Sequence, residues 1–374
     1  MPKKKNEKAK EYEKIKNKLM LLGLFLSFAF LLGSFALGKE GGLSSWFARW
    51  IETWSSSCWI TVAVYGIGGV LVSTLLFLPL KFYAGFTLEH RYHLSNETAG
   101  GWFLDLSKSL VLDLILTVAM LEIIYALLRT VTDSWWLYAA GLWILFVVLL
   151  GNLFPILILP LFYKLKPVEN KTLVNKLIKM AAKVKAKILG VYEMDMSRKT
   201  KKANAMLAGL GHTKRIIFGD TILNQYTQKE IEAILAHELG HFYYKHTWKQ
   251  IFLSSIATLI GLFLTHHVLS YFVGVIGFRG LEDVANFPLL LLSLSLFFFI
   301  ITPLNNIFSR YCERQSDRFA LEQTNDPKSF ISSMEKLAEQ NLADLEPNPF
   351  IEFCLHSHPS IGKRIQMAKM FKKG

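Results

Sequence analysis

Six apolar runs of about twenty residues constrain this chain more than any other feature of its sequence. They cover residues 19–38, 59–80, 110–131, 135–160, 251–273 and 287–308. Each is long enough for a helix to cross about 30 Å of hydrocarbon. Because backbone groups cannot stay unpaired in lipid, the runs predict six transmembrane helices. The apolar fraction of 52% and the charged fraction of 19% exclude a disordered chain, a collagen-like fibre and an ordinary soluble globule.

The first run follows a tail, residues 1–18, with eight Lys and three Glu. A cleavable signal peptide with a small residue, Ala36, near its end is one alternative. The long basic tail and the length of the run favour an uncleaved first span. Between the first two spans, residues 44–57 combine two charges with several tryptophans. That composition predicts a helix lying at the membrane surface rather than a further span.

The net charge of +13 lies mostly on one face of the predicted membrane. With the N-terminus inside, the segments on that face are 1–18, 81–108, 161–250 and 309–374, and they hold 38 of the 42 Lys and Arg residues. The loops on the other face hold three. The positive-inside rule therefore puts these four segments in the cytoplasm. Anionic membrane lipid is the expected neighbour of this charge, and no nucleic acid is needed to explain it.

This pattern divides the chain into five parts. They are a basic cytoplasmic tail at 1–18, membrane spans at 19–160, a cytoplasmic segment at 161–250, two further spans at 251–308, and a second cytoplasmic segment at 309–374. The first cytoplasmic segment is predicted to hold a helix, two short strands and a second helix, at 171–187, 191–194, 215–219 and from Thr227. The second cytoplasmic segment is predicted to be mostly helical. The fold class is an α-helical multi-pass membrane protein with a mainly helical cytoplasmic domain and a small β element.

Residues 237–241 read His-Glu-Leu-Gly-His. Thr227 and Glu230 have the spacing of a capping box, which predicts that a helix begins there. On that helix His237 and His241 lie on one face, one turn apart, and this spacing suits a single Zn²⁺ ion. Glu238 beside them is placed to act as general base on a water molecule.

A catalytic zinc needs a third protein ligand and an open fourth position. The metzincin pattern does not fit, because Thr247 stands where that pattern needs histidine. His246 follows His241 by five residues, so it is expected to point away from the ligand face. The preferred third ligand is Glu313, which follows the last span on the same membrane face. Asp317, one turn later, is placed to orient a ligating histidine.

A second histidine motif lies near the C-terminus, where His358 precedes Pro359. The proline favours an extended residue before it. A histidine on such a turn can donate a hydrogen bond to a developing oxyanion. The residues alone slightly favour a plain surface turn over this catalytic role.

Taken together, the motifs are similar to those of the integral-membrane zinc endopeptidases of the CAAX prenyl protease family, the type that also processes yeast mating pheromone. The similarity runs from about Phe82 to the C-terminus. The similar segments, in order, are 86–89, 94–98, 160–167, 204–205, 215–223, 236–241, 309–320 and 358–359.

The resemblance implies a role for each residue of the catalytic motifs. It implies that His237, His241 and Glu313 bind one catalytic Zn²⁺. It implies that Glu238 is the catalytic base and that His358 faces the scissile carbonyl.

Around these residues the resemblance implies that Asp317 and Arg364 support the site and that Asn204 and Ala205 contact the substrate backbone. The substrate would lie as an added strand along the edge near residues 204–218. The family's fold is a helical barrel around a water-filled intramembrane chamber, with a gluzincin-like zinc site at its cytoplasmic end. Eukaryotic members have seven spans, so six to seven are expected here.

We therefore expect a zinc endopeptidase that acts on peptide or protein substrates at the cytoplasmic face of the bacterial inner membrane or the endoplasmic reticulum. By resemblance, it removes the C-terminal tripeptide of prenylated peptides. No motif here recognises a prenyl group, so a general membrane-protein quality-control metalloprotease is the alternative. A non-enzymatic transporter or scaffold with structural zinc is disfavoured, because structural zinc usually has four Cys or His ligands. The sequence specifies no oligomeric state.

Overall fold

The computed structural model describes residues 3–37 and 41–371. Residues 1–2 of the predicted tail, Gly38 of the first span and the last three residues of the chain therefore lie outside it. Among the described residues, six helices are long and apolar enough to cross a membrane. They are α1 (Lys3–Ala36), α3 (Cys58–Phe82), α5 (Ala99–Thr130), α6 (Trp135–Leu153), α11 (His246–Ile276) and α12 (Phe287–Thr324). The six predicted spans are confirmed as helices.

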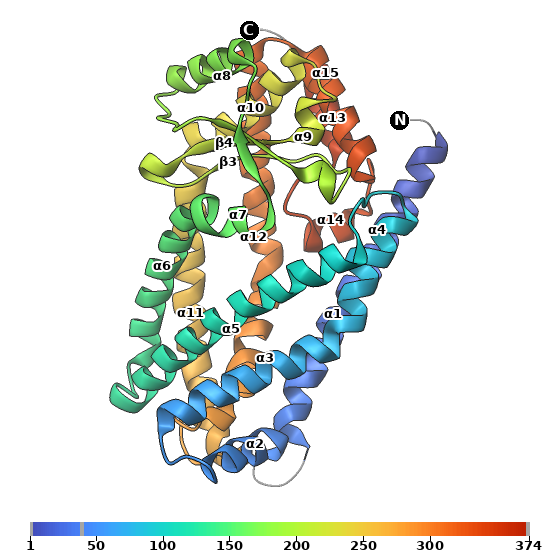
Figure 1. The fold of residues 1–374 in the computed structure, drawn as a ribbon. Coiled ribbons are helices and arrows are strands. Elements are labelled where there is room, and N and C mark those ends of the chain that lie inside the picture. The colour runs from blue at the N-terminus through green and yellow to red at the C-terminus, as the bar shows by residue number, and fades with distance from the viewer. Residues whose placement is uncertain (1–2, 38–40, 372–374) are drawn as a thin grey trace.

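The shorter helices gather mainly at one end of the molecule. They are α2 (Gly42–Glu52), α4 (Leu88–Arg91), α7 (Leu159–Phe162), α8 (Lys171–Lys183), α9 (Asp220–Leu223), α10 (Gln228–Tyr243), α13 (Pro327–Asn341), α14 (Pro349–Leu355) and α15 (Ile361–Met370). Figure 1 shows α8, α10, α13 and α15 beside the small sheet at one end of the long helices, and α2 at the other end. The predicted helix at 171–187 ends early, because Lys185 has a φ of 58°, which is left-handed backbone that a helix cannot continue.

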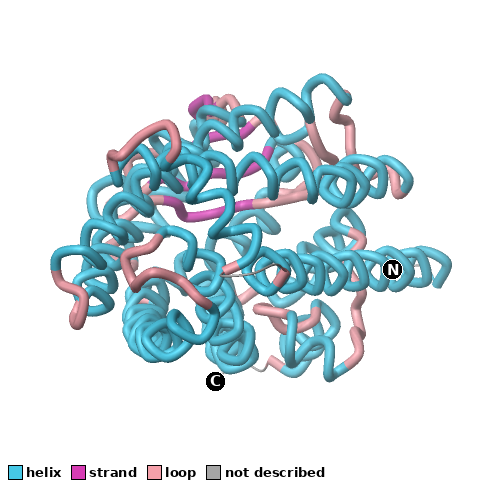
Figure 2. The backbone as a smooth tube through the Cα atoms, turned by 90° about the horizontal axis from the view of Figure 1, so that it is seen from below, coloured by secondary structure: helices cyan, strands magenta, loops and turns pink. Residues whose placement is uncertain are grey.

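A four-stranded sheet lies among the helices (Figure 2). Its strands are β1 (Leu165–Pro167), β2 (Val191–Met194), β3 (Ala205–Ala208) and β4 (Arg215–Gly219), in the order β1-β2-β4-β3. β2 and β4 pair in parallel, and the two outer pairs are antiparallel. The predicted strands at 191–194 and 215–219 are confirmed. The expected edge at 204–218 is wrong for β4, which is paired on both sides, and holds only for β3.

Helix α10 is fixed at its start by the predicted capping box. The Thr227 side chain accepts from the Glu230 backbone N–H at 3.4 Å, and the Glu230 carboxylate accepts from the Thr227 N–H at 2.7 Å. Glu230, which is 3% exposed, also accepts from Ser332 and Lys336 of α13. One face of α10 packs its isoleucine and leucine side chains on the sheet. The capping box thus also ties α10 to the C-terminal helices.

Helices α10 and α12 approach each other most closely at Gly240. A Cβ atom built on Gly240 would lie 2.8 Å from the Cα atom of Ser316, so only glycine fits without a shift of backbone. The contact sets α10 directly against the part of α12 that continues past the predicted span end at residue 308 to Thr324. A membrane span and a segment of the polar domain are therefore one continuous helix.

The predicted surface helix at 44–57 is present as α2, which at 11 residues is too short to span a bilayer. It buries Ala48 and Ile51 and exposes Trp46 and Trp50. Its end is held by Arg279, whose guanidinium donates two hydrogen bonds to Glu52, at 2.7 and 2.8 Å. The position of α2 relative to the lipid stays a prediction.

We expect Gly240→Ala to lower the free energy of unfolding by about 1–3 kcal/mol, because the added methyl group overpacks the contact between α10 and α12. Thermal unfolding of the purified protein in detergent measures this. Gly141→Ala in α6 is the matched control, since a Cβ there has no neighbour within 4 Å. Equal unfolding midpoints for the two variants would contradict the close approach.

Candidate metal centre

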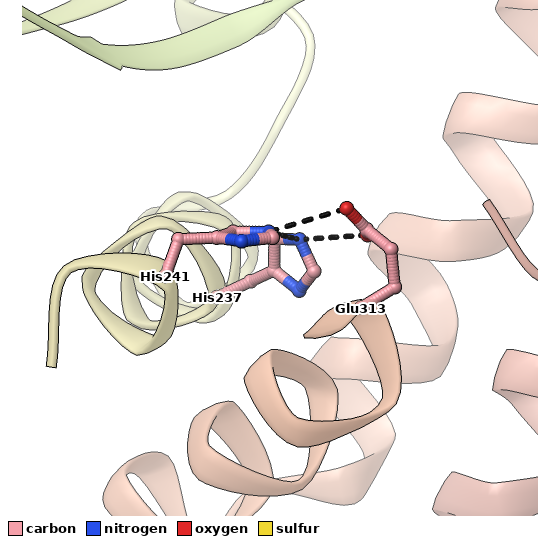
Figure 3. A group of neighbouring side chains, drawn as sticks. All are labelled: His237, His241 and Glu313. Atoms are coloured by element: carbon pink, nitrogen blue, oxygen red, sulfur yellow. Dashed lines mark hydrogen bonds and ion pairs between the residues drawn. The ribbon is translucent and has the colours of Figure 1, made fainter. Parts of the chain in front are cut away.

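Two helices bring the three predicted ligands together. α10 presents His237 and His241 from one face, and α12 presents Glu313 opposite them (Figure 3). The two Nε2 atoms lie 3.2 Å apart. Each of them lies 3.3 Å from one carboxylate oxygen of Glu313. His237 and Glu313 are 76 residues apart in the chain.

These residues fit a metal cation. Bonds of about 2.0–2.2 Å at tetrahedral angles put neighbouring donor atoms about 3.3–3.5 Å apart, which is close to the spacing observed. The Glu313 Oε2 atom is buried and has no hydrogen-bond partner, a cost that a cation between the three side chains would remove. Two histidines and one carboxylate also leave the fourth position of a tetrahedral site free.

The first histidine is held from behind by a charged pair. The Nδ1 atom of His237 lies 2.8 Å from Asp317 Oδ1. Arg364 of α15 donates two hydrogen bonds to the same carboxylate, at 2.5 and 2.8 Å. Burial opposes a charge on His237, but its contact with Asp317 and the nearby carboxylate of Glu313 outweigh it and raise the pKa of its imidazole to about 9. The pocket therefore favours positive charge between the two carboxylates.

Glu238 and His241 line a cleft of about 690 Å³. Leu207 of β3 and Gly209 after it line the same cleft, so the free edge of the sheet runs into the site. Asn204 and Ala205, the predicted substrate contacts, lie at the start of β3. They are not among the described residues that line this cleft.

His358 reaches the site from the loop between α14 and α15. Its Nε2 atom lies 3.2 Å from Glu313 Oε1, and its Nδ1 atom lies 2.9 Å from Ser357 Oγ. The His358 side chain is 61% exposed and is free to face a bound ligand. His358 therefore lies beside Glu313, and its role toward a substrate stays a prediction.

Sequence reasoning missed two residues of the site. Arg310, one turn before Glu313, is buried and donates to the backbone carbonyls of Glu352 and His356, at 2.9 and 2.5 Å. It thus fixes the loop that carries His358. Its position three residues before Glu313 could have identified it, because that spacing puts both side chains on the same face of α12. His246 is the second missed residue, since its ring packs against the ring of His241.

A multi-pass helical fold and a His-His-Glu centre beside a glutamate define a metallopeptidase embedded in a membrane. The comparisons agree. Residues 167–371 match the family described as Peptidase family M48, and residues 1–164 match the CAAX prenyl protease N-terminal family with five membrane helices. The chain belongs to Peptidase family M48, and it is a membrane metalloprotease.

Several known proteins are similar over most of the chain. The uncharacterized metalloprotease YhfN of Bacillus subtilis is 30% identical and covers 96% of this chain and 84% of its own length. The probable CAAX prenyl protease 1 of Schizosaccharomyces pombe is 31% identical over 81% of this chain and 64% of that protein. The crystal structure of S. mikatae Ste24p matches with a TM-score of 0.83 at 22% identity, over 98% of this chain and 89% of that one. The predicted fold class is thereby confirmed.

We expect Arg364→Ala to destabilise the protein by about 3–5 kcal/mol, because it leaves the fully buried Asp317 carboxylate without its cationic partner. Arg318→Ala in α12 is the matched control. Its pair with Glu322 is exposed, so its loss should change stability little. Thermal unfolding of the two metal-free variants tests this, and similar midpoints would show that the Arg364–Asp317 pair does not stabilise the fold.

Proposed function

We propose that His237, His241 and Glu313 bind one Zn²⁺ and that the chain is a zinc endopeptidase. The observation that carries this proposal is the tetrahedral spacing of the three donors, with Glu238 beside them in a cleft that reaches the edge of a sheet. Zinc bound there would polarise a substrate carbonyl and lower the pKa of a water molecule.

The chain's own residues transfer the proton, stabilise the oxyanion and bind the peptide. Glu238 takes a proton from the attacking water and passes it to the leaving amine. His358 donates a hydrogen bond to the oxyanion that develops on the scissile carbonyl. The peptide pairs with the free edge of β3 as an added strand, and Asn204 and Ala205 contact its backbone at the start of that strand. Asp317 and Arg364 keep His237 in place.

We also propose that this site faces the cytoplasm. The segments that join the polar end of the molecule hold 38 Lys and Arg, against three in the loops of the other face. The protease helices and the basic start of α1 lie at the same end (Figure 1).

As the native reaction we propose removal of the C-terminal tripeptide from prenylated peptides. Support comes from the relatives named CAAX prenyl protease 1 and from the match of residues 1–164 to the N-terminal module named after that enzyme. A general membrane endopeptidase is the second candidate. It is favoured by the Bacillus subtilis relative, which matches nearly the whole chain and is named only a metalloprotease.

A paired cleavage assay separates the two candidates. Purified protein in detergent is given a peptide ending in a farnesylated CAAX motif and the same peptide without the lipid, with Glu238→Gln as the blank. We expect cleavage of the lipidated peptide alone and loss of at least about 100-fold in rate for the variant. Equal cleavage of both peptides would select the general endopeptidase. Full activity of zinc-loaded Glu238→Gln would overturn the assignment of the base.

We expect a chelator to abolish hydrolysis and added Zn²⁺ to restore it. Glu313→Gln should bind Zn²⁺ more weakly by at least about 10-fold, because an amide oxygen is a poorer ligand than a carboxylate. Metal content after dialysis measures this directly. Glu322→Gln, an exposed change on the same helix, is the control, and equal zinc content in both variants would remove Glu313 from the ligand set.

A further inference from the structure

His246 is buried behind the metal centre and uses both of its ring nitrogens. It is the first residue of α11 and is 2% exposed. Its Nδ1 atom lies 3.1 Å from Nδ1 of His241, and its Nε2 atom lies 3.0 Å from Oε1 of Gln315 in α12. The amide of Gln315 in turn donates from Nε2 to the hydroxyl of Tyr311 at 3.0 Å. The four side chains form one hydrogen-bonded row that ends at His241.

The direction of the protons along this row follows from what each atom can do. An amide oxygen only accepts, so the Nε2 atom of His246 must carry the proton that Gln315 accepts. A neutral imidazole then has a lone pair at Nδ1, which accepts from the Nδ1–H group of His241. His241 is left with its lone pair on Nε2. That atom faces His237 and Glu313.

We propose that His246 is a positioning residue of the metal centre, which holds the His241 ring in the tautomer and orientation that present Nε2 to the metal. Partners of this kind behind ligating histidines raise metal affinity by about 10- to 100-fold. The inference rests on the proposed ligand set. In this role His246 supports the His241 ring as Asp317 supports the His237 ring.

Local structure holds His246 in this place. Lys245 has a φ of 56°, so the chain turns sharply between α10 and α11 and brings His246 back against α10. The ring of Tyr244 stacks on the ring of His246, with centroids 5.6 Å apart and planes inclined by 20°. The turn therefore puts a residue five positions after His241 behind the ligand face, where simple helical spacing would not put it.

Three substitutions at one position separate positioning from packing. His246→Asn keeps an acceptor oxygen where Nδ1 stood, within reach of His241. His246→Gln keeps a polar atom where Nε2 stood and loses the contact with His241. His246→Leu fills the space with no acceptor. Competition between the full chain in detergent and a chromophoric chelator measures the affinity for Zn²⁺ of each variant.

We expect the Gln and Leu variants to bind Zn²⁺ about 10- to 100-fold more weakly than the parent, and the Asn variant to retain most of the affinity. Thermal unfolding of the metal-free proteins shows whether each variant is folded. His266→Ala is the matched control, because His266 lies in the same helix and its ring accepts a hydrogen bond from Trp135, at 3.1 Å, away from the metal centre. It should leave Zn²⁺ affinity unchanged.

The outcomes distinguish this inference from the proposed function. If the parent binds Zn²⁺ and hydrolyses peptide while the folded Gln and Leu variants bind as tightly as the parent, the role of His246 is refuted and the endopeptidase stands. Equal weakening in all three variants would also refute it, since it would indicate packing. A parent chain that binds no Zn²⁺ would overturn both.

Discussion

The contact between α10 and α12 is the interaction on which the rest of the site depends. Gly240 lets the two helices approach until a Cβ atom would meet the Ser316 backbone. Without that approach, the two histidines and Glu313, which belong to different helices, would not lie close enough to form the proposed ligand set. Asp317, one turn beyond Glu313, is fully buried and reaches His237 across the same contact. A single close crossing thus supplies the proposed third ligand and the support for the first.

Much of this arrangement could be predicted because its signals are local. The HExxH spacing, the capping box of Thr227 and Glu230, and the six apolar runs each occupy one stretch of sequence, and all three appear as helices in the expected places. The role of His246 could not be predicted, because it depends on the left-handed turn at Lys245 that helical spacing does not foresee. The paired position of β4 was also missed, since strand order is set by contacts between distant segments. The periodicity of a sequence predicts whether a segment is a helix or a strand, but it does not predict which segments pack or pair with it.

The polar domain and the membrane helices are joined by more than the chain itself. The segment between β2 and β3 is held to α5 and to α4 by salt bridges. Lys199, which is 8% exposed, pairs with Asp105 of α5, and Lys202 pairs with Glu89 of α4 at 2.6 Å. Lys199 also lies over the ring of Tyr163. Because these ties precede β3 directly, the strand edge that we propose for the peptide is fixed relative to the membrane helices, and with it the distance from the bilayer at which a substrate can be held.

Helix α12 both spans the bilayer and carries Glu313. A movement of its lipid-embedded part can therefore be transmitted along the helix to the metal centre. A long apolar helix adapts to a thinner or thicker bilayer by tilting. Pro303 lies within the last predicted span, five residues before its end at residue 308 and ten before Glu313, and it has no backbone N–H to give to the preceding turn. Bending of α12 costs least at that residue. Bending at Pro303 therefore takes up a change of tilt before it reaches the crossing with α10, and this lets one helix serve membranes of different thickness.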